Sequence, residues 1–108
     1  MSWCVFCAIV HREEPATIHY ETEEIIVFEN NLRWTPVMLL VTPKPHVSQA
    51  EMWRSWMDRV APLAVRLGQE LCPKGFRLLS NLGSDAMQSQ DHGHLHILGG
   101  RHLGHYVY

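Results

Sequence analysis

Three histidines alternate with other residues near the carboxyl end of the chain, at His92, His94 and His96. Successive residues of a β-strand point to opposite faces of a sheet, so a strand from His92 to Leu98 would carry all three imidazoles on one face. The opposite face would then present Leu95 and Ile97 for burial against a helix. The pattern predicts a helix-backed sheet with a functional site on the histidine face.

Apolar and β-branched segments predict four further strands, over residues 18–20, 25–29, 37–42 and 76–81. A short helix is expected over residues 5–11. Ser48 and Glu51 form a capping-box pattern that begins a long amphipathic helix ending near Leu71. Pro62 lies inside that helix and should kink or briefly interrupt it, because proline lacks a backbone donor and clashes with the preceding turn. The expected fold class is α+β, with helices on one face of the sheet.

The bulk composition excludes several classes of function. The length of 108 residues fits one domain over residues 1–108, and 46% hydrophobic with 19% charged residues is typical of a globular chain. The net charge is −2 and the basic residues are scattered, so nucleic acid is not an expected partner. The longest strongly apolar run, Val37–Val41, has only the length of a strand, so a membrane is not an expected partner either. No signal peptide is recognisable, which predicts a cytoplasmic protein. Four tryptophans in so short a chain favour a homodimer that covers some of them.

The histidine pattern by itself leaves three interpretations open. The imidazoles could belong to an active site, or two or three of them could hold a catalytic zinc ion, because His-x-His pairs on strands are common metal ligands. They could also be polar residues on an exposed strand face without a role. Perfect alternation in a chain with eight histidines makes the third interpretation the weakest.

A longer motif narrows these alternatives. The segment Gln88–Arg101, QSQDHGHLHILGGR, resembles the signature of the histidine triad (HIT) family, closest to its Hint branch. Similarity extends to Asn81–Asp85, to Pro43–His46 and to Phe6. The resemblance implies a five-stranded antiparallel sheet with one short and one long helix, joined into ten strands in a homodimer. It also implies hydrolysis or transfer at the α-phosphate of purine nucleotide derivatives, such as adenosine phosphoramidates, without an organic cofactor.

The resemblance assigns separate roles to the residues around the phosphate. The middle histidine, His94, would be the nucleophile and form a nucleotidyl-histidine intermediate, while His96, Asn81 and Ser89 would contact phosphate. An imidazole with an ordinary pKa of about 6.5 is largely neutral at pH 7, so one nitrogen can attack phosphorus directly. The other nitrogen must then donate its proton to an acceptor, and a backbone carbonyl near His92 is expected there.

For the nucleoside, the resemblance implies apolar walls formed by Phe6, Ile9 and Phe28, although plain core packing of these three is an equally good interpretation. Asn30 stands where the family usually has an aspartate that binds ribose. An amide can donate and accept hydrogen bonds but lacks the negative charge, so weaker or altered sugar selection is expected.

A metal site is also expected. Cys4 and Cys7 supply two ligands at the spacing of many zinc sites, and the resemblance adds His46 and His92 as the other two. Four protein ligands leave no open coordination position, so this zinc would be structural and His94 would stay free of metal. A redox pair or two buried cysteines are the alternatives for Cys4 and Cys7.

The sequence departs from the family pattern at several positions. Met38 replaces a histidine of the third strand, and a thioether cannot donate a proton, so slow turnover is expected. Ala86 and Met87 replace a glycine pair in the phosphate loop, which is costly if that loop needs a positive φ. The carboxyl end also lacks the Trp-Pro-Pro-Gly tail of the Hint branch. These changes keep a second function open, a nucleotide-binding module with little or no catalysis.

Overall fold

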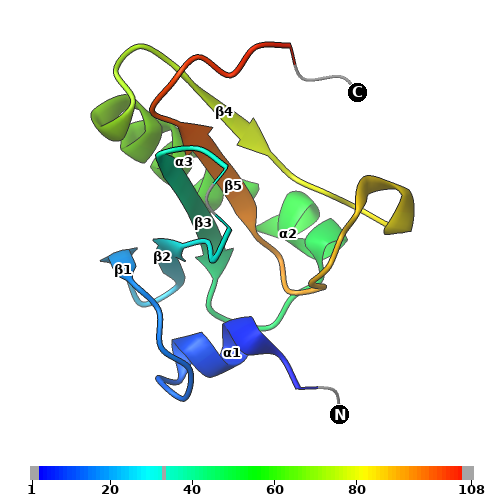
Figure 1. Cartoon of the computed structure of the whole chain (residues 1–108). Coiled ribbons are helices and arrows are strands. Elements are labelled where there is room, and N and C mark those ends of the chain that lie inside the picture. The colour runs from blue at the N-terminus through cyan, green and yellow to red at the C-terminus, as the bar shows by residue number, and fades with distance from the viewer. Residues whose placement is uncertain (1–2, 33, 106–108) are drawn as a thin grey trace.

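The computed structural model describes residues 3–32 and 34–105 and consists of one five-stranded antiparallel sheet with helices around it (Figure 1). The strands lie side by side in the order β1-β2-β3-β5-β4. The elements follow the chain as α1 (Val5–Val10), β1 (Ile18–Glu21), β2 (Ile25–Glu29), β3 (Val37–Pro43), α2 (Gln49–Ser55), α3 (Met57–Leu71), β4 (Phe76–Leu79), the short 3₁₀ helix η1 (Ser84–Ala86) and β5 (Leu95–Gly99). The predicted α+β class and antiparallel sheet are confirmed.

Both faces of the central strands are buried, against different partners. On one face, alternate residues of β2, β3 and β5, such as Val27, Leu39 and Ile97, pack with Met52 of α2 and Val60 of α3. On the other face, a smaller cluster joins α1 to the sheet through Phe6, Ile9, Ile26, Phe28 and Leu40. The alternation of side chains in β2 and β3 therefore separates a helix-covered face from a face that carries the site.

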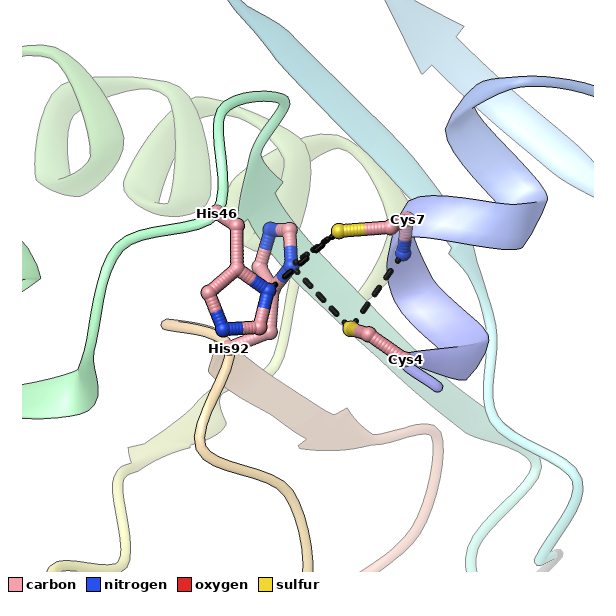
Figure 2. Close-up of side chains that lie close together, drawn as sticks. All are labelled: Cys4, Cys7, His46 and His92. Atoms are coloured by element: carbon pink, nitrogen blue, oxygen red, sulfur yellow. Dashed lines mark hydrogen bonds between the residues drawn. The ribbon is translucent and has the colours of Figure 1, made fainter. Parts of the chain in front are cut away.

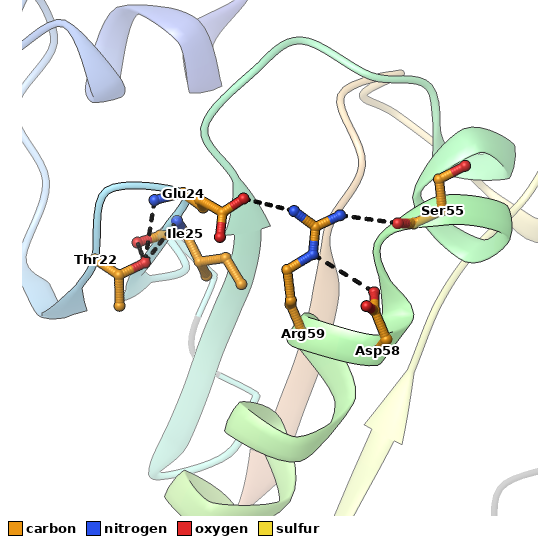
Figure 3. A network of polar contacts seen from close by, with 6 residues as sticks. All are labelled: Thr22, Glu24, Ile25, Ser55, Asp58 and Arg59. Atoms are coloured by element: carbon orange, nitrogen blue, oxygen red, sulfur yellow. Dashed lines mark hydrogen bonds and ion pairs between the residues drawn. The ribbon is translucent and has the colours of Figure 1, made fainter.

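The long helix is interrupted at Trp56, which separates α2 from α3, and not at Pro62, which lies within α3. The backbone leaves the helical region at Trp56, where φ is −121° and ψ is −12°, so the bend between the two helices lies there. Arg59 stabilises the bend, because its guanidinium donates to the Ser55 carbonyl at 2.9 Å and lies 3.9 Å from the centre of the Trp56 ring. The same guanidinium pairs with Glu24 at 2.6 Å and so ties α3 to the β1–β2 turn (Figure 3).

The strand that was predicted to begin at His92 begins at Leu95, and β4 ends at Leu79 instead of Asn81. The segment ahead of β5 bonds to the entry of α2 instead of to a neighbouring strand. The Gly93 N–H donates to the Val47 carbonyl at 2.8 Å, and a Cβ at Gly93 would lie 2.7 Å from that of Met52. His92 and His94 are therefore held by local contacts and not by strand pleating, and only His96 belongs to the strand.

In the described part of the chain, no helix is long and apolar enough to cross a membrane.

Candidate active site and metal cluster

A cavity of about 550 Å³ opens on the face of the sheet that carries α1. The structure brings eight of the predicted site residues to its walls: Phe6, Ile9, Phe28, Asn30, Asn81, Ser89, His94 and His96. Met38 also lines the cavity and is buried, whereas His92 is not among the lining residues. The three histidines therefore do not form one row, because His94 and His96 face the cavity and His92 lies behind it.

His94 is held in one tautomer. Its Nδ1 lies 2.7 Å from the carbonyl oxygen of His92, and because a carbonyl can only accept, Nδ1 must carry the proton. Nε2 is left with its lone pair. Burial lowers the pKa of His94 below the ordinary value, so the ring is neutral at neutral pH. The structure thus provides the backbone acceptor that the sequence predicted near His92, and it leaves a nucleophilic nitrogen on a buried side chain.

Gln49, the first residue of α2, positions the backbone on both sides of the cavity. Its Oε1 accepts from the His94 N–H at 2.7 Å, and its Nε2 donates to the Asn81 carbonyl at 3.1 Å. Each partner can bond in one way only, so the orientation of the amide is determined. The side chain is 1% exposed. No sequence pattern singles out this residue, because a polar residue in the first turn of a helix is usually at the surface.

His96 lies beside His94, with 5.1 Å between the ring centres. In the sheet, Leu40 and Leu79 are its neighbours on either side. Burial, with a smaller contribution from His94, lowers the pKa of His96 to about 4. His96 is therefore neutral under physiological conditions and can offer one N–H to an anionic ligand without adding positive charge.

The loop between β4 and β5 forms the far wall of the cavity. Gln88 fixes this loop, because its side chain accepts from the Gly83 N–H at 2.7 Å and donates to Asp91 at 3.2 Å. Met87 has a φ of 60°, in the left-handed region, and its side chain is 84% exposed. The loop does require a positive φ at this position, where a glycine would be unstrained.

Four potential metal ligands meet at the amino end of α1: Cys4, Cys7, His46 and His92 (Figure 2). Their ligand atoms all lie within 4.8 Å of one another. The sulfur-to-Nδ1 distances are 3.5 Å for Cys4–His92, 3.3 Å for Cys7–His46 and 3.5 Å for Cys7–His92. A tetrahedral zinc ion with ordinary bond lengths separates its sulfur and nitrogen ligands by about 3.5 Å. The cluster therefore has the composition and the spacing of a four-coordinate metal site.

The ring of His92 is also oriented for metal binding. Its Nε2 donates to the Pro43 carbonyl at 2.7 Å, so Nδ1, which faces the two sulfurs, has the free lone pair. Desolvation and the neighbouring Cys4 raise the pKa of the Cys7 thiol to about 11. A bound cation offsets this effect, because metal ligation favours the thiolate. Among the residues that the structure describes, this is the one group of three or more potential ligands, and it leaves out His94 and His96.

Asn30 lines the cavity near the β2–β3 turn, and its Oδ1 already accepts from the Leu32 N–H at 3.0 Å. Its amide nitrogen remains available as a donor. The cavity lining also includes Glu14, Asn31 and Trp34, none of which the sequence singled out. Their segments are turns and connections, where the sequence does not indicate which side chains face inward.

Comparison with known proteins agrees with this architecture. Residues 11–103 match the model of the HIT domain family. A HIT family hydrolase from Clostridium thermocellum superposes with a TM-score of 0.89 at 32% identity, over 100% of this chain and 99% of that one. A structure described as a hypothetical histidine triad nucleotide-binding protein from Sulfolobus tokodaii gives 0.79 at 31%, over 89% and 68%. A zinc-bound histidine triad family protein from Mycobacterium smegmatis gives 0.73 at 27%, over 94% and 77%.

The family match covers most of the chain, and the structural similarity extends to its full length. The chain belongs to the HIT domain family.

Proposed function

We propose that this protein is a nucleotide hydrolase or transferase that acts at the α-phosphate of purine nucleotide derivatives, with nucleoside phosphoramidates as the model substrate. The hydrogen bond from His94 Nδ1 to the His92 carbonyl carries the proposal, because it leaves Nε2 as a nucleophile on the cavity wall. Similar structures described as a hydrolase and as a nucleotide-binding protein support it.

The reaction has two steps. In the first, His94 Nε2 forms a bond to the α-phosphorus while the phosphorus–nitrogen bond to the amine breaks, and the departing nitrogen takes a proton from solvent. In the second, water attacks phosphorus, the bond to His94 breaks, and a nucleoside monophosphate is released with one proton. Transfer of this kind depends mainly on positioning and on donors around the phosphoryl oxygens. His96, Asn81 and Ser89 are proposed as those donors.

The nucleoside is proposed to lie between Phe6, Ile9 and Phe28, with Asn30 near the ribose. The rings of Phe6 and Phe28 are 5.4 Å apart between centres, in an edge-to-face arrangement. Phe6 also lies 5.0 Å from His94, so this apolar wall adjoins the nucleophile. The three side chains are buried, as their alternative role in core packing also requires. A nucleotide is proposed to lie against the small part of their surface that faces the cavity.

Zinc is proposed as the structural metal of the Cys4, Cys7, His46 and His92 cluster. The ligand distances and the His92 tautomer support this assignment, as does the similar zinc-bound structure. When bound, the ion would stabilise the two thiolates and tie α1 to the segment that carries the His92 carbonyl. It would not take part in the reaction, because four protein ligands leave no position for substrate.

A nucleotide-binding module with little turnover is the second candidate, and Met38 favours it. Met38 is 3% exposed and lines the cavity, so the third strand offers a thioether where the family usually has a histidine. No proton can come from this side chain. We therefore expect turnover to be slow even if His94 is the nucleophile.

We also propose a single domain over residues 1–108 that forms a homodimer and acts in the cytoplasm. None of Cys4, Cys7 and Cys72 forms a disulfide with another described residue, which suits a reducing compartment. No nucleic-acid or membrane partner and no organic cofactor is part of the proposal.

The decisive experiment incubates the protein with adenosine phosphoramidate and compares wild type with His94→Ala. We expect nucleoside monophosphate to be released by wild type, with the rate reduced at least about 10³-fold in the variant. The exposed His105, outside the cavity, provides the control His105→Ala, which should keep full activity.

The other outcomes separate the candidates. Nucleotide binding without turnover would favour the binding module. Activity that survives in His94→Ala would eliminate the histidine nucleophile. Activity that disappears on chelation without loss of structure would favour a zinc hydrolase.

A further inference from the structure

Glu14 is a half-buried carboxylate on the wall of the cavity, in the connection between α1 and β1. No hydrogen bond or ion pair to this carboxylate is found within the described ranges 3–32 and 34–105. Its neighbour Glu13 is exposed and does not line the cavity. A carboxylate that is partly removed from water without a partner in the protein is available to a ligand.

The position of Glu14 is determined by the end of α1. Arg12 has a φ of 63°, in the left-handed region, and the N–H groups of Glu13 and Glu14 both donate to the Ala8 carbonyl, at 2.8 and 3.3 Å. The Arg12 side chain donates back to the Ile9 carbonyl at 3.3 Å and pairs with Glu21. Pro15 follows and restricts the backbone of Glu14. This turn directs Glu14, and not Glu13, toward the cavity.

Glu14 lines the cavity from beside the carboxyl end of α1, where its N–H donates to the Ala8 carbonyl at 3.3 Å. The Phe6 ring is 5.0 Å from that of His94, Ile9 follows almost one helical turn later, and Glu14 lies beyond the end of α1. A nucleotide extends from phosphate through ribose to base. With phosphorus at His94 and the ribose near Asn30, the edge of the base reaches Glu14.

We infer that Glu14 selects guanine over adenine, an inference that rests on the nucleotide function proposed above. Guanine presents two adjacent donors on one edge, N1–H and the N2 amino group, which a carboxylate can accept with its two oxygens. Adenine presents an unprotonated N1 on the same edge, so the carboxylate would face an acceptor. Hypoxanthine retains N1–H but lacks the amino group and should bind with intermediate affinity.

Calorimetric binding of GMP, IMP, AMP and dGMP to wild type, Glu14→Gln and Glu13→Gln tests this inference. Hydrogen bonds to a charged group contribute enough to predict a preference for GMP over AMP of about 10- to 100-fold in wild type. Glu14→Gln should weaken GMP binding about 10-fold or more and reduce the preference, with IMP affected less. Glu13→Gln removes the same charge one residue away and should bind all four ligands as wild type does.

The ribonucleotide and deoxyribonucleotide arms distinguish the base from the sugar. If the ratio of GMP to dGMP affinity is the same in wild type and Glu14→Gln, the carboxylate acts on the base. If the ratio of GMP to dGMP affinity differs between Glu14→Gln and wild type, the carboxylate acts on the ribose hydroxyls, and the inference is overturned. Equal binding of GMP and AMP by wild type would overturn it as well, while leaving the nucleotide function standing. If none of the four nucleotides binds and the protein does not cleave adenosine phosphoramidate, both the role of Glu14 and the proposed nucleotide function are eliminated.

Discussion

At the scale of single residues, Gln49 shows how one buried amide can hold two parts of a site together. Its side chain bonds to the backbone of His94 and of Asn81, and its own N–H lies 3.4 Å from the Asp91 carboxylate. These contacts connect the start of α2 with both ends of the loop that forms the far wall. Gln49 touches no phosphate in the proposed mechanism, so it is a positioning residue.

Gln49→Leu should therefore destabilise the protein and slow its turnover. The substitution leaves the buried His94 N–H and the partly buried Asn81 carbonyl without partners, and we expect the free energy of unfolding to fall by about 2 to 4 kcal/mol. Urea denaturation measures this change, and kcat should fall more than KM rises because the nucleophile is displaced. Gln69→Leu, on the exposed face of α3, is the matched control and should change little. Equal effects of the two substitutions would contradict the positioning role.

His96 predicts a pH dependence of stability. Burial lowers its pKa in the folded protein to about 4, whereas an unfolded histidine titrates near 6.5. Above pH 6.5 the side chain is neutral in both states. As the pH falls from 6.5 toward 4, the unfolded chain takes up a proton that the folded protein does not, so the folded state loses stability. Over this pH range, the free energy of unfolding should fall less in His96→Asn than in wild type or in the exposed-site control His102→Asn. The same dependence on pH in all three proteins would contradict this prediction.

Several residues of the site could be identified from the sequence because each belongs to a short motif. Cys4 and Cys7 are three positions apart, and His92, His94 and His96 fall within one segment. Gln49 and Glu14 could not be identified in this way. Their importance depends on contacts across the fold and on which side of a turn a side chain faces, and neither is encoded in local spacing.

At the scale of elements, α1 is attached to the sheet in two ways. Phe6 and Ile9 pack on Phe28 and Leu40, and Cys4 and Cys7 approach His46 and His92 at the amino end of the helix. A six-residue helix has little stability of its own. A metal ion held by Cys4 and Cys7 would therefore also hold the wall that Phe6 contributes to the cavity.

Removal of the metal should loosen α1 without unfolding the molecule. After chelation we expect amide hydrogen exchange in residues 4–11 to become at least about 10-fold faster, because local opening no longer requires breaking the metal bonds. The amides of α3 pack on the opposite face and serve as an internal control. Zinc, but not magnesium, should restore protection, because thiolate and imidazole ligands suit zinc. Unchanged exchange in α1 would show that the cluster is not a structural metal site.

The sequence predicted every strand of the sheet but not all the boundaries, for identifiable reasons. Continuous apolar and β-branched runs locate β2 and β3 correctly, because both faces of these strands are buried. The alternation of His92, His94 and His96 misplaces the start of β5, since the segment ahead of Leu95 bonds to the entry of α2. The sequence pattern also misses the break at Trp56, which Arg59 stabilises by a long-range contact with Glu24.

At the scale of the whole molecule, the two edges of the sheet differ. β1 forms one edge, and β4 forms the other. Large apolar side chains are exposed near β4: Trp53, 47% exposed, bonds to Ser80 just after the strand, and Leu82, 48% exposed, follows it. An unpaired strand bordered by apolar side chains is suited to pairing with a second copy. The proposed homodimer would therefore form through β4, which gives a continuous sheet of ten strands.

This dimer makes a prediction that separates the two edges. Sedimentation at micromolar concentration should give about twice the 12.5 kDa mass of one chain. Hydrogen exchange of the outward-facing amides of β4 should slow as protein concentration rises, since pairing protects them, whereas exchange in β1 should not depend on concentration. Protection of β1 instead would place the interface on the other edge. If the protein is a monomer at all concentrations and exchange in β4 does not change, the proposed dimer is wrong. Trp53 and Leu82 would then remain exposed to solvent, and the cavity would be complete within one chain.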